Sequence, residues 1–75
     1  MVEIDDTPVR LTPREREVVA LIAGGMSAKG IARKMNLSHR TVERHIETCR
    51  CKLRASNQAQ LVAKALAGGL ISLSE

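Results

Sequence analysis

The sequence contains no tryptophan, tyrosine or phenylalanine. A hydrophobic core must therefore consist of aliphatic side chains, and a chain of 75 residues has room for only one small domain. We expect a simple helical fold, because a thin core favours local contacts. The sequence also lacks a phosphate-binding glycine loop, a metal cluster and a workable His/Cys/Asp set, so we do not expect an enzyme.

Cysteine and long apolar runs are also scarce. The only two cysteines, Cys49 and Cys51, point about 200° apart on a helix and cannot bridge each other. They form a poor metal site, so we expect free thiols in a reducing cytoplasm, with no metal and no cofactor. No apolar run approaches the roughly 18 residues of a membrane span, and the polar N-terminus does not resemble a signal peptide.

Positive charge is concentrated in the middle of the chain. The formal net charge is +4, and residues 28–54 carry eight basic and only two acidic side chains. A compact basic segment is typical of proteins that bind a polyanion such as DNA. A solvated surface explains the charge equally well, so charge alone does not decide between them.

Capping residues and glycines divide the chain into four predicted helices. Thr12 and Glu15 form a capping box around Pro13, and Gly24-Gly25 ends the first helix. We expect an all-α domain without strands at 11–75, preceded by a flexible N-terminal arm at 1–10. The helices are predicted at about 13–23, 28–35, 39–54 and 58–67.

The second and third predicted helices form a candidate helix-turn-helix. A turn of about three residues joins them, and small or aliphatic side chains recur where such a motif packs its two helices together. On the third helix, buried positions form one stripe at steps of three and four: Val42, Ile46, Cys49 and Leu53. The opposite face carries Arg40, Glu43, Arg44, Glu47 and Cys51, in the arrangement of a recognition helix that enters the major groove.

We therefore predict DNA contacts at Lys29, Ser38, Arg40, Thr41, Glu43, Arg44, Glu47 and Arg50. A plain solvated face is the alternative, because glutamates and arginines at helical spacing can pair with each other. The two glutamates would repel phosphate. They fit a DNA-facing surface only if they accept hydrogen bonds from cytosine or orient a neighbouring arginine.

These residues together resemble the LuxR/FixJ-type (GerE-like) helix-turn-helix family. The resemblance covers most of the chain and is carried by LTPREREV at 11–18, Leu21-Ile22-Ala23, Gly25, Ser27, Ile31-Ala32, Ser38, Thr41-Val42, His45, Lys52-Leu53 and Gly69-Leu70-Ile71. It implies a four-helix domain whose third helix enters the major groove, dimerisation through the fourth helix, and regulation of bacterial transcription.

The sequence departs from this family at three positions. Gly30 stands where glutamate is usual, and Cys49 replaces a frequent isoleucine. Gln58 stands where arginine is frequent, which removes a possible salt bridge to Glu15. The chain also has no room for the N-terminal phosphoacceptor or small-molecule domain that the family usually carries, so it resembles a stand-alone member or an excised domain.

The fourth predicted helix has more apolar surface than one small core requires. Its apolar arc spans about 240°, whereas packing on one side needs little more than about 100°. We expect a homodimer interface at Ala59, Val62, Ala63 and Leu66; the alternative is that the alanines are present simply as good helix formers.

We predict a sequence-specific, double-stranded DNA-binding transcriptional regulator that binds as a dimer, with RNA polymerase as a possible further partner. The alternative is a protein-interaction module that inhibits a full-length relative by heterodimerisation. Single-strand and RNA platforms usually stack bases on aromatic residues, which this chain lacks.

Overall fold

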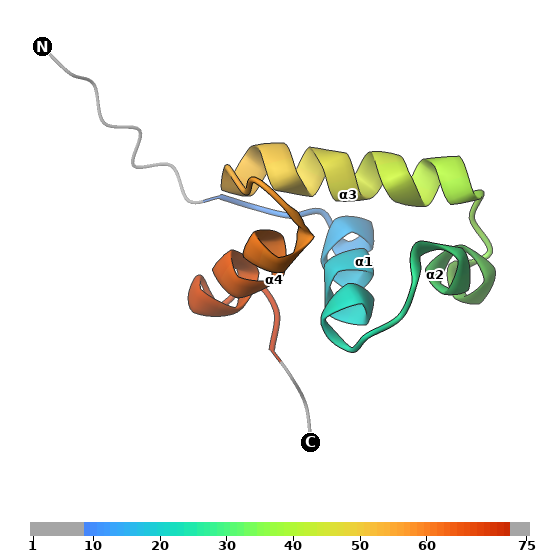
Figure 1. Ribbon diagram of the computed structural model, residues 1–75, viewed down its shortest axis with the longest axis horizontal. Coiled ribbons are helices and arrows are strands. Elements are labelled where there is room, and N and C mark those ends of the chain that lie inside the picture. Colours follow the sequence, from blue (N-terminus) through green and yellow to red (C-terminus); the bar gives the residue numbers. More distant parts are fainter. Residues whose placement is uncertain (1–8, 73–75) are drawn as a thin grey trace, which may run out of the picture.

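The computed structural model describes residues 9–72, and this part of the chain contains four helices and no strand. They are α1 (Pro13–Ala23), α2 (Ala28–Met35), α3 (His39–Leu53) and α4 (Gln58–Ala67) (Figure 1). The predicted all-α fold is confirmed. Most of the predicted arm at 1–10 lies outside the described residues, and so does the end of the predicted domain at 73–75.

The predicted helix bounds match the structure with one exception. The third helix ends at Leu53, not at Arg54. Arg54 instead adopts a left-handed conformation with φ of 54°, and its backbone N–H bonds back to the last turn. A residue in this conformation cannot continue a right-handed helix.

Local side-chain caps explain where the helices begin. The Thr12 hydroxyl accepts a hydrogen bond from the Glu15 backbone N–H at 3.1 Å, and the Glu15 carboxylate accepts one from the Thr12 N–H at 2.9 Å. The predicted capping box is therefore confirmed. Ser27 caps α2 by accepting from the Gly30 N–H at 3.1 Å, and Asn57 caps α4 in the same way.

The core has no aromatic side chain, consists mainly of aliphatic residues, and is organised as two clusters joined by α3. One lies between α1, the C-terminal half of α3 and α4: Leu11, Val19, Cys49, Ala55, Leu61, Ala65 and Ile71. The other lies between α1, α2 and the N-terminal half of α3: Val18, Ile22, Ile31, Ala32 and Val42. Ile46 packs against both clusters, so the predicted apolar stripe of α3 contributes to both and connects them.

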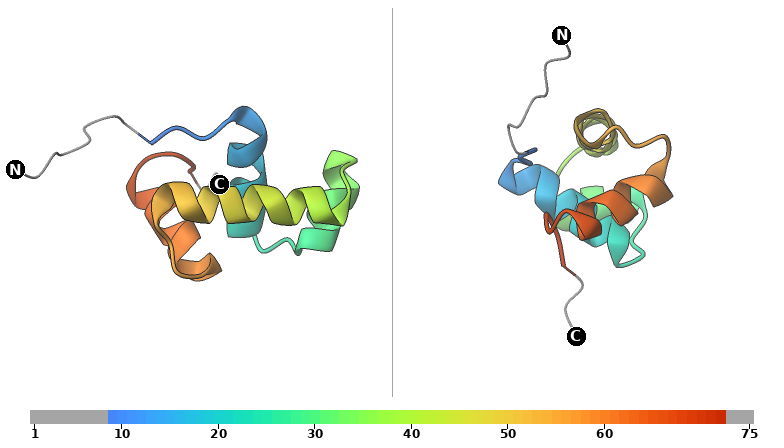
Figure 2. Two further views of the ribbon diagram at one scale, coloured as in Figure 1. Left: turned by 90° about the horizontal axis from the view of Figure 1, so that it is seen from above. Right: turned by 90° about the vertical axis from the view of Figure 1, so that its left-hand side faces the viewer.

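The α3 helix runs along one side of the molecule, with the other three helices on its inner side (Figures 1 and 2). None of the other three helices found between residues 9 and 72 covers its outer face. This arrangement follows from the burial pattern of α3: Val42 and Cys49 are fully buried, whereas side chains on the opposite face are exposed. Cys49 thus serves as a small core residue in place of isoleucine.

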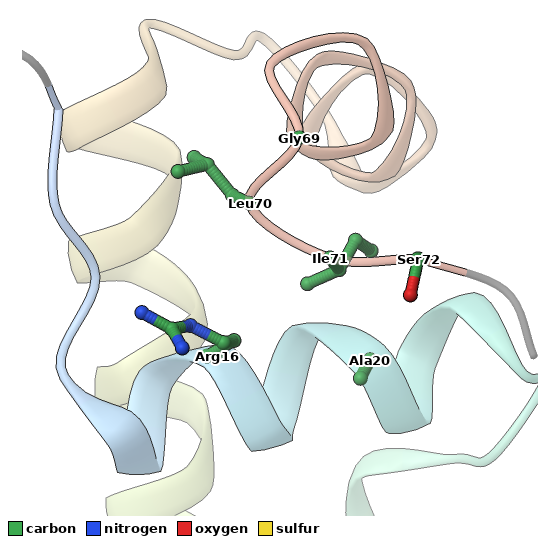
Figure 3. A pocket seen from close by; sticks show the side chains of 6 residues that line it. All are labelled: Arg16, Ala20, Gly69, Leu70, Ile71 and Ser72. Carbon is green, nitrogen blue, oxygen red and sulfur yellow. The ribbon is translucent and has the colours of Figure 1, made fainter.

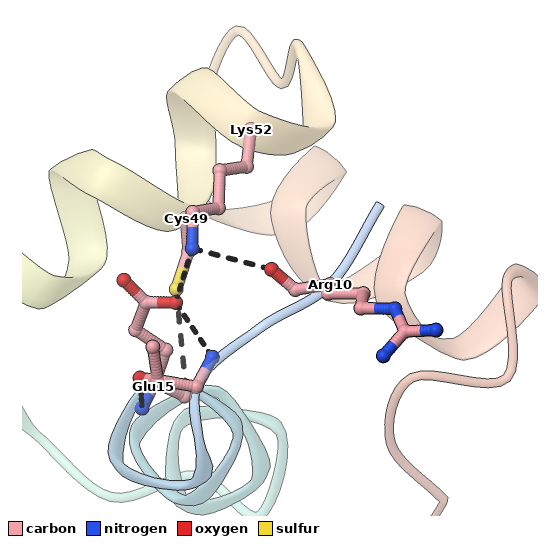
Figure 4. A network of polar contacts seen from close by, with 5 residues as sticks. Arg10, Glu15, Cys49 and Lys52 are labelled. Atoms are coloured by element: carbon pink, nitrogen blue, oxygen red, sulfur yellow. Dashed lines mark hydrogen bonds and ion pairs between the residues drawn. The ribbon is translucent and has the colours of Figure 1, made fainter. Parts of the chain in front are cut away.

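A part-buried ion pair joins the start of α1 to the end of α3 (Figure 4). Glu15 is only 6% exposed, and its Oε1 lies 2.7 Å from Nζ of Lys52. Lys52 also donates to the backbone carbonyl of Arg10 at 3.2 Å. Burial opposes ionisation of Glu15, but the hydrogen bonds and charge of Lys52 and the bonds to Thr12 outweigh it and lower the pKa of Glu15.

This pair gives Lys52 a role within the domain. Lys52, which is one of the residues that carry the resemblance, binds through its ammonium to the Glu15 carboxylate and to the Arg10 carbonyl. The loss of an arginine at position 58 does not leave Glu15 without a cation. Gln58 is exposed at the start of α4, and Lys52 provides the counter-charge instead.

Candidate nucleic-acid interface

The turn between α2 and α3 sets the helix-turn-helix geometry. Asn36 ends α2 in a left-handed conformation with φ of 58°, which asparagine tolerates better than most residues. The next backbone N–H, of Leu37, bonds to the carbonyl of Ala32 at 2.8 Å. Because the Leu37 side chain packs against the second cluster, the turn is fixed from both ends.

Ser38 and Thr41 are engaged with each other at the start of α3. The Ser38 hydroxyl accepts from the Thr41 backbone N–H at 3.0 Å and donates to the Thr41 hydroxyl at 2.8 Å. Capping is therefore the structural role of Ser38, as the pattern indicated. Ser38 is exposed and Thr41 is half-buried, so the N-terminal end of α3 is accessible from outside the domain.

The outer face of α3 carries the predicted mixture of charges. Its exposed members are Arg40, Glu43, Arg44, Glu47 and Cys51. Arg40 and Arg44 lie one turn apart in the N-terminal half, and neither makes an ion pair or side-chain hydrogen bond within residues 9–72. Their guanidinium groups are therefore available to an external anion or base edge.

Arg50 differs from these two arginines because its guanidinium is bound within the domain. One terminal nitrogen lies 3.1 Å from Oε1 of Glu47, and the other donates to the backbone carbonyl of Ser56 at 2.8 Å. The Nε atom of Arg50 is buried without a hydrogen-bond partner among the described residues. This pairing of Glu47 with Arg50, at spacing i, i+3, is what the alternative of a plain solvated face predicts.

Glu43 has a much looser environment than Glu47. Its carboxylate lies 3.8 Å from Nε2 of His39, one turn earlier, and both side chains are about half exposed or more. Such an exposed pair contributes little to stability. His45, which flanks the buried stripe, is half-buried as a packing role requires.

The one remaining predicted contact, Lys29, lies on α2, which carries two further basic residues. Lys29 is exposed in its first turn, and Arg33 and Lys34 are exposed in its last turn. Gly30 is half-buried between them, and a Cβ there would come within 3.0 Å of Cγ of Met26. The glycine thus accommodates the Met26 side chain at a position where the family usually has glutamate.

The predicted contact surface of α4 divides into two kinds of residue. Ala59 and Ala63 are exposed one turn apart, as an interface with a second molecule requires. Val62 and Leu66 are half-buried, because each also packs on one of the two core clusters. The apolar arc of α4 is therefore shared between the domain's own core and its surface.

Some contacts that shape this region could not be found from the sequence. Lys64 of α4 donates to the carbonyl of Arg54 at 2.7 Å, and Gln60 accepts from the Ser56 N–H at 2.8 Å. Together with Arg50 they fasten the α3–α4 connection. Spacing on a helix indicates the Glu47–Arg50 pair, but no local pattern predicts a bond to a loop carbonyl.

The other features of the surface lie away from α3. An open hollow of about 380 Å³ separates α1 from the C-terminal segment, lined by Arg16, Ala20, Gly69, Leu70, Ile71 and Ser72 (Figure 3). Between residues 9 and 72, no three His, Cys, Asp or Glu side chains are grouped so as to hold a metal ion. Within the same residues, no helix has both the length and the apolar character needed to cross a membrane.

Comparison with solved structures supports the same arrangement. The structure of the transcription factor GerE superposes with a TM-score of 0.82 at 36% identity, covering 85% of this chain and 96% of GerE. A VqmA–ligand–DNA complex from Vibrio cholera superposes with a TM-score of 0.80 at 34% identity, covering 99% of this chain and 32% of VqmA.

Sequence comparison gives a consistent result. The transcriptional activator protein SolR of Ralstonia nicotianae is 40% identical over 91% of this chain, and the probable transcriptional regulator ycf29 of Cyanophora paradoxa is 33% identical over 96%. The chain spans 29% of the length of SolR and 34% of that of ycf29. The profile of the bacterial regulatory proteins of the luxR family matches residues 9–65. This chain therefore belongs to the luxR family of bacterial regulatory proteins and has that family's helix-turn-helix domain.

Proposed function

We propose that this chain binds double-stranded DNA in a sequence-specific manner and regulates transcription, with α3 in the major groove. The observation that carries the proposal is the division of α3 into two faces. Its aliphatic stripe is buried, and its outer face presents Arg40 and Arg44 without partners among the described residues. Arginine is well suited to this role because its planar donors match the two acceptors of guanine in the major groove.

The charge distribution supports the same proposal. Neutralising backbone phosphates with basic side chains supplies most of the non-specific affinity of DNA-binding proteins. The exposed Lys29, Arg33 and Lys34 on α2 provide such charge, and Arg33 and Lys34 lie in its last turn, before the connection to α3. The related VqmA has been solved as a complex with DNA, which is consistent with this use of the fold.

Substitution of Arg44 tests the proposal directly. We expect Arg44→Ala to weaken binding to a selected site by about 1–3 kcal/mol if the side chain reads a base. Fluorescence anisotropy with labelled duplexes, at several salt concentrations, measures the affinity. An equal loss on random DNA would assign Arg44 to a phosphate, and an unresponsive wild-type protein at low ionic strength would contradict DNA binding.

We also propose that the chain forms a homodimer through α4. The exposed Ala59 and Ala63 lie next to Val62 and Leu66, which gives a continuous apolar strip on one helix. A two-fold dimer would place two α3 helices on two half-sites of a palindromic operator. The related VqmA of Vibrio cholerae has been described as a dimer.

A second candidate function remains supported by the two glutamates of α3. Glu43 and Glu47 are exposed on the face that would approach phosphates. A module that inhibits a full-length relative through α4 would tolerate such charges. It would bind duplex DNA weakly by itself but form a stable mixed dimer, so a gel shift with and without the full-length relative distinguishes the two functions.

A further inference from the structure

Glu47 and Arg50 form an ion pair on the outer side of α3, and a second bond of Arg50 holds this pair in place. Arg50 binds the Ser56 carbonyl at 2.8 Å through one terminal nitrogen and Oε1 of Glu47 at 3.1 Å through the other. The side chain of Arg50 is 34% exposed, whereas that of Glu47 is 64% exposed. The arginine is therefore held by the domain, and the glutamate is the member that faces outward.

The second oxygen of this carboxylate is free to accept a strong hydrogen bond. Its only hydrogen-bond partner among the described residues is the thiol of Cys51, which donates to Oε2 over 3.9 Å. A thiol is a weak donor. Glu47 thus presents an acceptor whose direction is set by the contact of its other oxygen with Arg50.

The pair also removes the electrostatic objection to an acid on this face. An isolated carboxylate would be repelled by the phosphates of a duplex, but Arg50 compensates the charge of Glu47 at short range. Glu43 has no comparable partner. Its nearest cationic group is the His39 ring at 3.8 Å, which carries charge only when it is protonated.

We propose that Glu47 determines specificity by accepting a hydrogen bond from the exocyclic amino group of a cytosine in the major groove. Arg50 is then a positioning residue that holds Glu47 and does not itself contact DNA. This inference rests on the proposed DNA-binding function and deepens it.

The chemistry of the base edges selects cytosine. Cytosine offers an amino donor, whereas guanine presents only acceptors there and thymine presents an acceptor and a methyl group. Adenine has an amino donor beside the N7 acceptor, which repels a carboxylate. A fixed carboxylate therefore favours one base of four.

Selection of bound duplexes from a random pool, with the wild-type protein and with Glu47→Gln, tests the role of Glu47. We expect one operator position at which the wild type prefers cytosine roughly tenfold, in the lower part of the range for a good contact to a base edge. Glu47→Gln should lose this preference and turn towards adenine, because a carboxamide matches the donor and acceptor of adenine.

Glu17→Gln is the matched control, since it removes the same charge from an exposed residue of α1 that lies outside the predicted contact surface. It should leave the preference at that position unchanged. An unchanged preference in Glu47→Gln, or a change at that position in Glu17→Gln, would overturn the inference.

Arg50→Gln tests the positioning role. We expect loss of discrimination at the same position as in Glu47→Gln, with selection retained elsewhere, and no further loss in the double variant. A phosphate contact would instead weaken binding on all sequences and lower the dependence of log K on log salt by about one, and this result would contradict the assignment of Arg50.

Circular dichroism of each variant establishes that the fold is intact. If the folded wild-type chain binds no duplex at low ionic strength, the proposed function and this inference both fail. If it binds and selects DNA but Glu47 has no influence on the choice of base, only the inference fails.

Discussion

The Glu15 carboxylate shows how one residue can serve two purposes. It completes the cap of α1 and, through Lys52, ties the first helix to the end of α3. The cap is visible in the sequence because its partners are three residues apart. The bond to Lys52 spans 37 positions, and only the packing of α1 on α3 brings these two side chains together.

Acid should weaken the domain through this carboxylate. Because the pKa of Glu15 is lowered in the folded state, its contribution to stability is complete above the unfolded-state pKa and is lost as the pH falls through the folded-state pKa. We expect the free energy of unfolding to decrease below about pH 4.5, the ordinary value for the group. Urea unfolding between pH 7 and pH 3 measures this dependence.

Glu15→Gln is the control for that measurement and should show a smaller decrease over the same pH range. Lys52→Met should lower stability by about 1–2 kcal/mol at pH 7, because it leaves a buried carboxylate with the Thr12 N–H as donor but without its counter-charge. A pH dependence that is the same in Glu15→Gln as in the wild type would assign the acid sensitivity to other carboxylates.

The two cysteines should differ sharply in reactivity. Burial raises the pKa of the Cys49 thiol to about 11, and the nearby charge of Glu15 adds to the increase. Cys51 is exposed on the outer face of α3. Because the thiolate is the reactive form, a thiol reagent at pH 8 should modify Cys51 alone in the folded protein and both residues in denaturant. Mass spectrometry of the modified peptides checks this, and rapid modification of Cys49 in the folded state would contradict its burial.

At the level of the elements, the end of α3 depends on an unfavourable backbone conformation. Arg54 adopts φ of 54°, which is costly for a residue with a side chain. The structure holds it there through bonds from its N–H to the last turn and from Lys64 to its carbonyl. Neither the apolar stripe nor the charged residues indicate that α3 ends at Leu53, which explains why the predicted C-terminal bound is one residue too long.

Arg54→Gly should therefore stabilise the domain. Glycine adopts this conformation without the steric penalty, and we expect a gain of about 0.5–1 kcal/mol after the greater freedom of the unfolded chain is subtracted. Thermal unfolding followed by circular dichroism measures it. Ser56→Gly provides a comparison in the same connection, at a position whose backbone is not in the left-handed region, and it should give no such gain.

At the level of the whole molecule, the surface of α4 is where the monomer and the proposed dimer differ. Ala63→Glu would place a charge in the centre of the exposed strip without disturbing the buried Leu61 and Ala65. We expect the variant to remain folded and monomeric and to lose cooperative binding to a palindromic duplex. Sedimentation velocity with and without DNA measures its state. Gln60→Glu serves as the control for added charge, because this exposed residue of α4 lies outside that strip and a carboxylate there can still accept from the Ser56 N–H; the variant should retain dimerisation.

The sequence predicted the fold and the outward face of α3 because both arise from short-range patterns. Caps, glycine stops and a stripe at steps of three and four concern neighbours along one helix. The partners of Arg50 and Lys52 are different, since Ser56 and Glu15 reach them through a loop and through another helix. Residues whose roles depend on such tertiary bonds look identical to free surface cations when only the sequence is read.

The absence of aromatic residues has a practical consequence for these experiments. A protein without indole, phenol or phenyl rings emits no fluorescence of its own in the near ultraviolet, and its absorbance there is negligible beside that of a nucleotide. One tryptophan introduced at a chosen surface position would consequently report from that position alone. Optical signals from a labelled oligonucleotide would reach the detector free of any contribution from the polypeptide.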